Sequence, residues 1–277
     1  MTPPGWTLVV LAAGMGRRFG GDKQLAHLGP SGELLSDYTL YDAIEAGADR
    51  AVFVVRPDLR AALEEHHRGW RDRIALSYPV QEHPTGTTDA VLVAGDEVPG
   101  WSVVVNADDF YGREAIAAAA DWIRMADTRV GPSAGVIAFR LGDTFSDRGG
   151  VSRALLETDA EGCLTSIVER RDLTPDSGLA PELPVSMNCW VLPPGIKGLL
   201  QEETEWFRGQ PGGRAGQELP LPESMGRLVK RGKLRVKVLP AGRGWIGITH
   251  ADDVPRARAA LAARAARGEY PDSLLGR

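Results

Sequence analysis

Short apolar runs alternate with helical segments along the first half of the chain. The runs are rich in β-branched residues, which is typical of strands, and they span residues 7–13, 50–56, 73–80, 101–107 and 135–141. Between them, apolar residues recur at helical spacing, as in LLSDYTLYDAIEAG and GREAIAAAADWIRMA. Because the runs are apolar at successive positions, both faces of each strand are predicted to be buried. The pattern predicts an α/β fold with a doubly wound, mostly parallel sheet, in which ligands bind beyond the carboxyl ends of the strands.

The alternation loosens after about residue 142. Residues 151–170 are predicted to form an antiparallel hairpin, followed by strands at 185–192 and 233–239 and a helix over about 251–267. These elements are predicted to extend the first sheet rather than to fold separately. We therefore expect one domain over residues 1–277, with halves at about 1–141 and about 142–277.

The composition narrows the class of protein. Of the 277 residues, 43% are hydrophobic and 25% are charged, as in a globular protein with a sizeable core. A net charge of −5 gives no broad basic field, so no nucleic acid partner is expected. The two cysteines, Cys163 and Cys189, lie in no CxxC motif, which disfavours a disulfide framework or a cysteine zinc site. Without an apolar run of roughly 18 residues or a signal-peptide pattern, we expect a soluble cytoplasmic protein with no membrane partner.

A glycine-rich loop, VVLAAGMGRRFGGDKQL at residues 9–25, follows the first strand. Glycines leave backbone N–H groups open to phosphate oxygens, and Arg17, Arg18 and Lys23 add positive charge. The Walker motif does not fit, because Gln24 stands where Ser or Thr is needed. The glycine spacing is also one residue wider than in the GxGxxG dinucleotide fingerprint. On these residues alone, the alternative to a phosphate-binding loop is a glycine turn with solvated basic side chains.

The stretch LAAGMGRRFGGDKQL resembles the signature loop of the sugar-nucleotide pyrophosphorylases, nucleotidyltransferases that join a nucleoside triphosphate to a sugar 1-phosphate. The resemblance implies a Rossmann-like, GT-A-like fold, with a mixed, mostly parallel sheet and an antiparallel substrate-binding elaboration. It gives catalytic roles to Arg18 and Lys23, which fall on the family's arginine and lysine. Arg17 departs from the family, which has Ser or Thr there. Nucleotide contacts are implied for Leu11, Ala12, Ala13, Gly14 and Gly16.

The segment QEHPTGTTDAV, residues 81–91, is similar to the family segment that recognises the nucleobase. The resemblance implies that Gln81 presents its amide to a pyrimidine and that Gly86 lets the base approach the backbone. Thr87 is included among the nucleotide contacts. On the residues alone, Thr87 or Thr88 equally fits the N-terminal cap of a helix.

Two carboxylates end the strand in VVVNADDFYG, residues 103–112. Carboxylate oxygens suit Mg²⁺, which takes one or two of them together with phosphate oxygens and water. Asp108 matches the first acid of the family's metal-binding pair, so we expect it to bind Mg²⁺ and the substrate phosphates. For Asp109, metal binding and capping of the following helix are equally favoured.

Three further motifs resemble the sugar-binding part of the family. GGVSR (149–153) is similar to a segment that contacts the sugar through its backbone, at Gly150. IVERR places Glu169 on the acid that binds sugar hydroxyls and Arg170 on the lysine that meets the sugar phosphate. The resemblance thus implies that Arg170 binds the phosphate of the sugar substrate, although arginine replaces the usual lysine and the following proline is missing. VSMNCWVL implies a sugar contact for Asn188. On Val168–Arg170 alone, the alternative to a sugar-binding site is an exposed strand end.

The C-terminal stretch GWIGITHADD resembles the family's Trp-x-Asp-x-Gly-Thr run, in which the aspartate is commonly the second Mg²⁺ ligand. Gly247 stands at that position, so the ligand is absent where expected. Asp252 or Asp253 could substitute, and we name Asp253 as the candidate ligand. A helix cap formed by Thr249 and Asp252 is the preferred interpretation of this spacing.

The implied reaction condenses a nucleoside triphosphate with a sugar 1-phosphate and releases pyrophosphate. Because Gln81 is expected to face a pyrimidine, UTP or dTTP is the expected triphosphate. A cytidylyltransferase acting on another phosphomonoester, such as phosphocholine, and a non-catalytic nucleotide-binding module remain alternatives. The nucleophile is already an anion, so no general base is needed. We therefore assign no catalytic role to the histidines, and His66 and His67 are predicted to be solvated on a charged helix. The sequence leaves open whether the chain forms a homo-oligomer.

Substitution of Lys23 by alanine tests the assigned role of the loop. Loss of one charged contact to the transition state is expected to lower turnover by at least about tenfold. The measurement is the rate of pyrophosphate release at saturating substrates, and unchanged turnover would refute the role.

Overall fold

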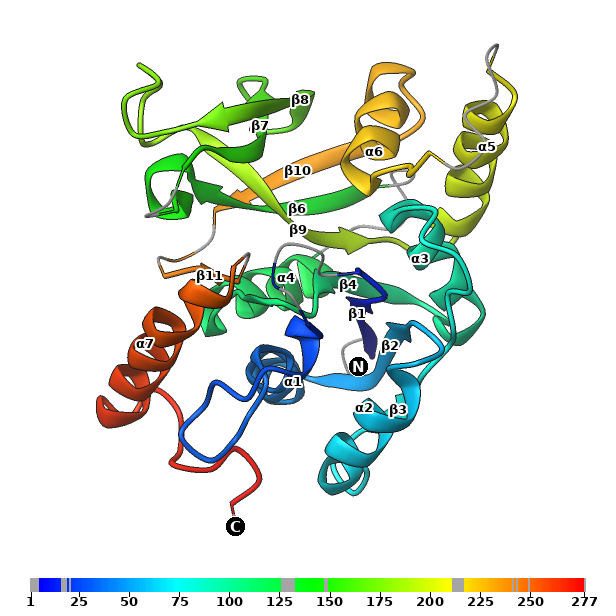
Figure 1. The fold of residues 1–277 in the computed structure, drawn as a ribbon. Coiled ribbons are helices and arrows are strands. Elements are labelled where there is room, and N and C mark those ends of the chain that lie inside the picture. The colour runs from blue at the N-terminus through cyan, green and yellow to red at the C-terminus, as the bar shows by residue number, and fades with distance from the viewer. Residues whose placement is uncertain are drawn as a thin grey trace.

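In the computed structural model, residues 5–15, 19, 21–125, 133–146, 149–210, 217–240, 242, 244–248 and 250–276 are described. Their central element is a mixed sheet with strand order β10-β6-β9-β4-β1-β2-β3 (Figure 1). In that order the strands span Arg235–Pro240, Ser133–Arg140, Pro184–Leu192, Trp101–Asn106, Trp6–Ala12, Ala48–Val55 and Ala75–Ser77. Neighbouring strands pair in parallel except β9, which is antiparallel to both β4 and β6. The predicted mostly parallel α/β fold is confirmed.

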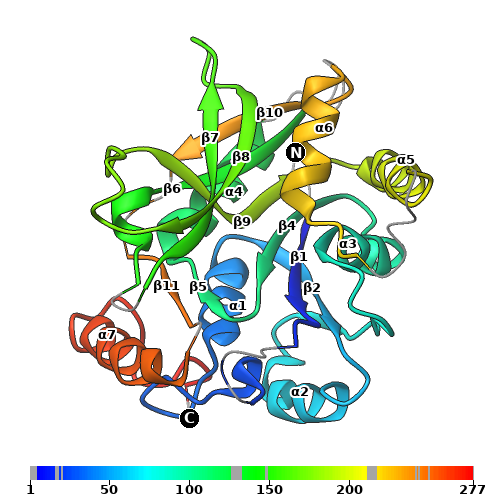
Figure 2. The same cartoon turned by 45° about the horizontal axis from the view of Figure 1, so that its top comes forward.

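The antiparallel part of the molecule lies beside β9. β7 (Val151–Thr158) and β8 (Leu164–Leu173) form the predicted hairpin, and β7 pairs with β9. Figures 1 and 2 both show this hairpin at the end of the molecule opposite α2 (Arg60–His66). A separate two-stranded sheet pairs β5 (Asp109–Phe110) with β11 (Ile246–Gly247). The second half of the chain thus extends the sheet of the first half.

Helices cover both faces of the sheet. One core contains apolar residues of α1, α4 and α7, and the other contains those of α3, α5 and α6. In β1, Leu8 and Val10 belong to the first core and Val9 and Leu11 to the second, which explains why the strand is apolar at every position. No helix within the described ranges is long and apolar enough to cross a bilayer. The helices span Leu35–Glu45 (α1), Thr87–Ala94 (α3), Arg113–Met125 (α4), Ile196–Arg208 (α5), Leu221–Lys230 (α6) and Val254–Ala266 (α7).

The strand predicted over residues 73–80 is shorter in the structure. Only Ala75–Ser77 pair with β2 as β3, and the pairing resumes at one bridge between Val55 and Val80. Pro79 lies between the two and has no N–H to donate to the ladder.

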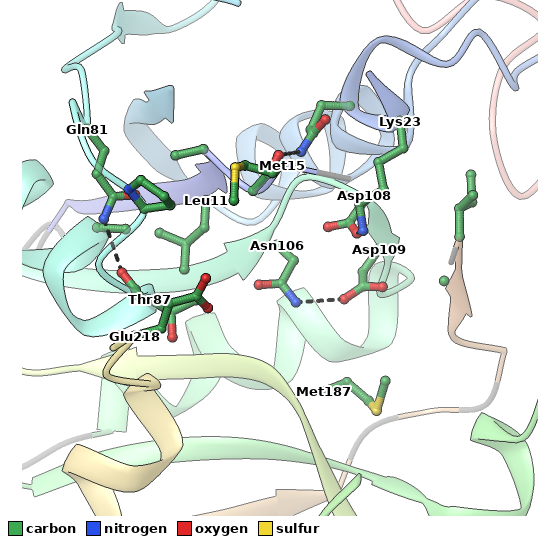
Figure 3. Close-up of a pocket in the computed structure, with 18 of the residues that line it drawn as sticks. Leu11, Met15, Lys23, Gln81, Thr87, Asn106, Asp108, Asp109, Met187 and Glu218 are labelled. Carbon is green, nitrogen blue, oxygen red and sulfur yellow. Dashed lines mark hydrogen bonds and ion pairs between the residues drawn. The ribbon is translucent and has the colours of Figure 1, made fainter. Parts of the chain in front are cut away.

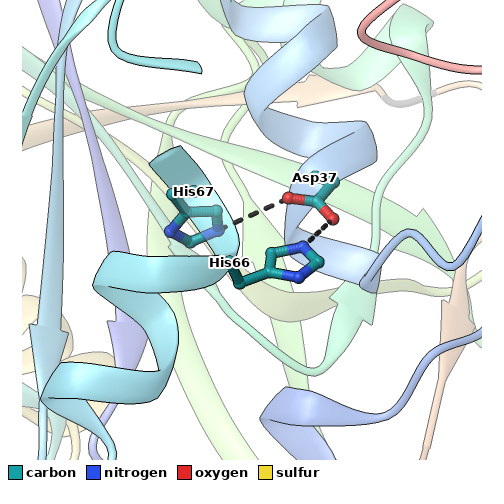
Figure 4. A group of neighbouring side chains, drawn as sticks. All are labelled: Asp37, His66 and His67. Atoms are coloured by element: carbon teal, nitrogen blue, oxygen red, sulfur yellow. Dashed lines mark hydrogen bonds and ion pairs between the residues drawn. The ribbon is translucent and has the colours of Figure 1, made fainter. Parts of the chain in front are cut away.

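The prediction that His66 and His67 are solvated is wrong. His67 is 0% exposed, because its ring packs against Phe53 at 4.3 Å between centroids and its Nδ1 lies 3.1 Å from the Tyr78 hydroxyl. His66 is half-buried. Asp37 of α1 lies between the rings: its Oδ2 is 2.6 Å from His66 Nε2 and its Oδ1 is 3.4 Å from His67 Nε2 (Figure 4). Burial alone would raise the pKa of Asp37, but the two histidines lower it to about 2. The cluster joins α2 to the first turn of α1.

Tyr270, near the C-terminus, also packs against α1. The Tyr270 hydroxyl donates a hydrogen bond of 2.6 Å to Asp42 Oδ2, and its ring meets Tyr38 edge-on at 5.0 Å between centroids. Asp42 Oδ1 is buried and accepts no hydrogen bond from the described residues. Burial raises the pKa of Asp42 to about 6, although Tyr270, Arg113 and Arg264 partly oppose the shift.

Replacement of Asp42 by asparagine is expected to change how stability depends on pH. A carboxyl group with a raised pKa stabilises the fold below its unfolded value of 3.8, and that contribution is lost as the pH rises through about 6. Asparagine can still accept the Tyr270 hydrogen bond but does not ionise. The free energy of unfolding of the variant should therefore rise relative to wild type by about 2 kcal/mol between pH 4 and pH 8.

Urea denaturation at pH 4, 6 and 8 measures this difference. Asp72→Asn is the matched control, because it makes the same chemical change at an exposed side chain. A difference between Asp42→Asn and wild type that stays constant with pH would mean that Asp42 has an ordinary pKa.

Candidate active site

A cavity of about 580 Å³ opens at the carboxyl ends of β1 and β4. Figure 3 shows Gln81 and Thr87 at one end of it and Lys23, Asp108 and Asp109 at the other. Eight residues selected from the sequence line its wall: Leu11, Ala13, Gly14, Lys23, Gln81, Gly86, Thr87 and Asp108.

The loop after β1 is held at both of its described ends. The Gly14 carbonyl accepts hydrogen bonds of 2.7 Å from Gln24 Nε2 and from Arg56 Nη1. Arg56 also donates to Asp22 Oδ1 at 2.6 Å, which joins the beginning of the loop to its end. The chain then forms a 3₁₀ turn, Lys23–Leu25, that directs Lys23 into the cavity. Gly16 and Arg18 lie outside the described residues, so their roles stay predictions.

Lys23 and Asp108 come together although they are far apart in the sequence. Lys23 Nζ forms an ion pair with Asp108 Oδ2 in the cavity wall, and both side chains are largely buried. The pairing follows from the topology, because β1 and β4 are parallel neighbours and their carboxyl ends meet at one edge of the sheet.

Asp109 is a buried carboxylate beside this ion pair. Its Oδ2 accepts a hydrogen bond of 2.9 Å from Asn106 Nδ2 and lies 3.2 Å from the Tyr111 hydroxyl. Asn106 is held in turn by Asn188, whose Nδ2 donates to Asn106 Oδ1 at 2.7 Å. Burial, reinforced by the charge of Asp108, raises the pKa of Asp109 to about 7. The helix-capping interpretation of Asp109 is therefore wrong, since its carboxylate takes part in a network within the site.

Gly247 lies directly opposite Asp109 in the pairing of β5 with β11. A Cβ atom at position 247 would lie 2.8 Å from Asp109 Oδ1 and 2.3 Å from the ring of Trp245. The space of a side chain at this position is thus taken by the Asp109 carboxylate and the Trp245 indole. Asp109 provides a carboxylate where the family resemblance leads one to expect an aspartate on the last strand.

Asp253 does not line the cavity among the described residues. Its Oδ2 accepts a hydrogen bond of 2.8 Å from the backbone N–H of His250 and caps the 3₁₀ turn Ala251–Asp253 that leads into α7. A cap does form at this helix end, one residue later than the spacing of Thr249 and Asp252 suggests. Thr249 lies outside the described residues.

Gln81 is buried at the opposite end of the cavity. Its Nε2 donates to the Gly86 carbonyl at 3.1 Å and to Asp89 Oδ2 at 2.9 Å. Both contacts use the amide nitrogen, and within the described chain no hydrogen bond reaches Oε1. The carbonyl oxygen of Gln81 is therefore the atom left to accept a hydrogen bond from a ligand.

The segment before α6 closes the cavity beside Gly86. Gly86 has φ +108°, and a Cβ there would lie 2.5 Å from the backbone of Leu219. Thr87 Oγ1 accepts a hydrogen bond of 2.7 Å from the Leu221 backbone, and Thr88 Oγ1 lies 2.9 Å from Ser224 Oγ. Neither threonine caps α3, because both hydroxyls bind α6 instead.

Several residues predicted to contact nucleotide or sugar lie outside the cavity wall. Ala12 is buried within β1, and Asn188 acts one layer behind the wall through Asn106. Glu169 and Arg170 are exposed on β8. Gly150 lies where a Cβ would be 2.6 Å from the Asp172 backbone, so it packs against the end of β8 rather than against the cavity.

Sequence reasoning missed several residues that line the cavity. Three of them lie within motifs that the sequence already indicated as functional: Asn106 in VVVNADDFYG, Arg153 in GGVSR and Trp245 in GWIGITHADD. Glu218 has no such signal, because the fold of the segment before α6 alone brings it to the cavity.

Comparison with known proteins supports this picture. Residues 8–130 match the model of the MobA-like NTP transferase domain. No curated protein sequence is similar enough to the chain to count as a match.

Solved structures resemble nearly the whole chain. A UDP-glucose pyrophosphorylase complexed with UDP-glucose has a TM-score of 0.64 and 18% identity, over 94% of this chain and 100% of that one. An inositol-1-phosphate CTP transferase from T. maritima has a TM-score of 0.65 and 13% identity, over 94% and 96%. A putative glucose-1-phosphate thymidylyltransferase from Bacillus anthracis, in complex with a sucrose, has a TM-score of 0.65 and 15% identity, over 92% and 94%.

At identities of 13–18%, the likeness to solved structures establishes the fold alone. The domain match covers residues 8–130, in the first half of the chain. Both findings agree with the predicted resemblance to the nucleotidyltransferases, the domain match over residues 8–130 and the structural likeness over the fold. The chain carries a MobA-like NTP transferase domain at residues 8–130, within the fold of the sugar-nucleotide nucleotidyltransferases.

Proposed function

We propose that this nucleotidyltransferase condenses a nucleoside triphosphate, UTP or dTTP, with a sugar 1-phosphate in a Mg²⁺-dependent reaction in the cytoplasm. The observation that carries the proposal is the division of one cavity between two ends. Lys23 and the pair Asp108–Asp109 lie at one end, and the Gln81–Gly86 segment lies at the other. A nucleotide with its base at the second end would bring its phosphates to the first.

The reaction is an attack by a phosphate oxygen of the acceptor on the α-phosphorus of the triphosphate. A new P–O bond forms, the bond from the α-phosphorus to the bridging oxygen breaks, and pyrophosphate leaves with the electron pair. The nucleophile is an anion already, so the protein has to position two anions and offset their charges. Lys23 is assigned to the α-phosphate, and Arg18 and the loop amides to the leaving pyrophosphate.

The side chains at the end of β4 fit a magnesium ion. Asp108 and Asp109 offer two carboxylates facing the same cavity, and Mg²⁺ commonly takes one or two carboxylates together with phosphate oxygens. Asn106 and Tyr111 hold Asp109 from behind, which orients it as an outer layer of hydrogen bonds orients metal ligands. When bound, the ion would offset the negative charge of the triphosphate. We therefore propose Asp108 and Asp109, and not Asp253, as its protein ligands.

The free Oε1 of Gln81 supports the choice of UTP or dTTP. A carbonyl oxygen accepts a hydrogen bond, and the ring N–H of uracil or thymine donates one, whereas the corresponding ring nitrogen of cytosine does not. The second candidate is transfer from CTP to another phosphomonoester. It is favoured by the equal structural likeness to an inositol-1-phosphate CTP transferase.

A panel of substrates tests the reaction. UTP, dTTP, CTP, ATP and GTP would each be combined with glucose 1-phosphate, inositol 1-phosphate and phosphocholine in the presence of Mg²⁺, and pyrophosphate release measured. We expect release with UTP or dTTP and the sugar phosphate. Release with CTP and a non-sugar acceptor would favour the second candidate, and nucleotide binding without release by any pair would make the protein a binding module.

Removal of single carboxylates tests the metal site independently of turnover. Asp109→Asn should weaken Mn²⁺ binding in calorimetry by at least about tenfold, because one charged ligand is lost. Asp253→Asn is the control and should bind Mn²⁺ like wild type. Normal affinity in Asp109→Asn together with loss in Asp253→Asn would reverse the assignment.

A further inference from the structure

Arg153 is a cation in the cavity that no part of the proposed reaction has used. It lies on β7 and lines the same cavity as Asp108 and Asp109. Among the described residues it forms no ion pair within 4 Å. Its three hydrogen bonds go to neutral oxygens: Nε to Thr144 Oγ1 at 3.1 Å, Nη1 to Ser152 O at 2.8 Å, and Nη2 to Thr144 O.

The guanidinium is fixed in place without being neutralised. Hydrogen bonds to Thr144 hold one edge of the Arg153 guanidinium. Its Cζ lies over the Trp245 ring, 5.3 Å from the ring centroid. A guanidinium has five N–H groups, so two have no acceptor among the described residues after the three hydrogen bonds. Burial lowers the pKa of Arg153, while Asp109 and Glu169 act in the opposite direction and help to keep it charged. A rigid, partly buried cation with spare donors is suited to a phosphate group.

The register of the hairpin separates Arg153 from the arginine that the sequence singled out. Arg153 lies directly opposite Arg170 in the pairing of β7 with β8. Arg170 is exposed and does not line the cavity, whereas Arg153 is half-buried and does. Like charges at directly opposite positions of two paired strands repel each other and destabilise the pairing. An anion bound at Arg153 would offset this repulsion between Arg153 and Arg170.

We propose that Arg153 binds the phosphate of the acceptor phosphomonoester, in the role that the sequence resemblance gives to Arg170. The inference rests on the proposed function, because it divides the cavity between two substrates. Lys23 serves the triphosphate on the β1 side, and Arg153 serves the acceptor phosphate on the β7 side. Arg153 is thus a binding residue that determines which acceptors the enzyme takes: those with a phosphomonoester.

Steady-state kinetics of Arg153→Gln and Arg170→Gln test the division of roles. In Arg153→Gln the KM for glucose 1-phosphate should rise at least about tenfold while the KM for the triphosphate stays within about twofold. Arg153→Lys should recover only part of the affinity, because lysine offers a point charge in place of the planar fork. Arg170→Gln is the matched control, with an acceptor KM within about threefold of wild type. An equal rise in both KM values for Arg153→Gln, or a larger acceptor effect for Arg170→Gln, would overturn the inference.

Calorimetry with glucose 1-phosphate and with inorganic phosphate separates this inference from the proposed function. Binding that is lost in Arg153→Gln supports the inference even if no pair of substrates releases pyrophosphate, in which case only the proposed function fails. Binding that is equal in wild type and Arg153→Gln, or absent from wild type, would overturn the inference even if pyrophosphate is released. Thermal unfolding of each variant checks that loss of the Thr144 contacts has not unfolded the hairpin.

Discussion

The parallel pairing of β1 with β4 is the constraint on which the site depends. Leu11 lies opposite Asn106, and the backbone N–H of Ala107 donates to the Leu11 carbonyl at 3.1 Å. Both strands therefore end at the same level, and the chain leaves each of them at the same edge of the sheet. A slip of one residue would exchange the two faces of β1, but apolar cores on both faces and pairing with β2 hold the register. The Lys23–Asp108 ion pair is the direct consequence of this register.

The antiparallel strand β9 adds the second constraint. It brings Asn188 to Asn106, which holds the Asp109 carboxylate from behind. A buried carboxylate beside another one is costly unless hydrogen bonds and opposite charges compensate it, and this network provides part of that compensation. Asn188 adopts φ +62°, a backbone conformation that Asn tolerates better than most residues, so the strand itself adapts to the site.

Two departures from the family pattern are related by the same geometry. Gly247 is paired with Asp109, and Arg170 is paired with Arg153, each across two antiparallel strands. Residues opposite each other in such a pair lie within about 5.5 Å, so a side chain on either strand can reach the same region. A charge missing from one strand, or turned to solvent on it, can therefore be supplied from the other. In both places the cavity contains a group of the expected charge on the neighbouring strand.

The sequence alone determined the strand–helix alternation and the parallel sheet, because these depend on local periodicity. It also singled out the glycine-rich loop after the first strand, because the residue types of that motif lie close together in the chain. It also led to Lys23, Gln81, Gly86 and Asp108, whose motifs are contiguous and which do line the cavity. It did not place Glu169, Arg170 or Asp253, and it treated His67, which is buried, as solvated. Which of two opposed residues faces a cavity depends on strand register and bulges, and whether a charged helix end is buried depends on what packs against it. Those are properties of contacts between distant segments, so only the tertiary structure decided them.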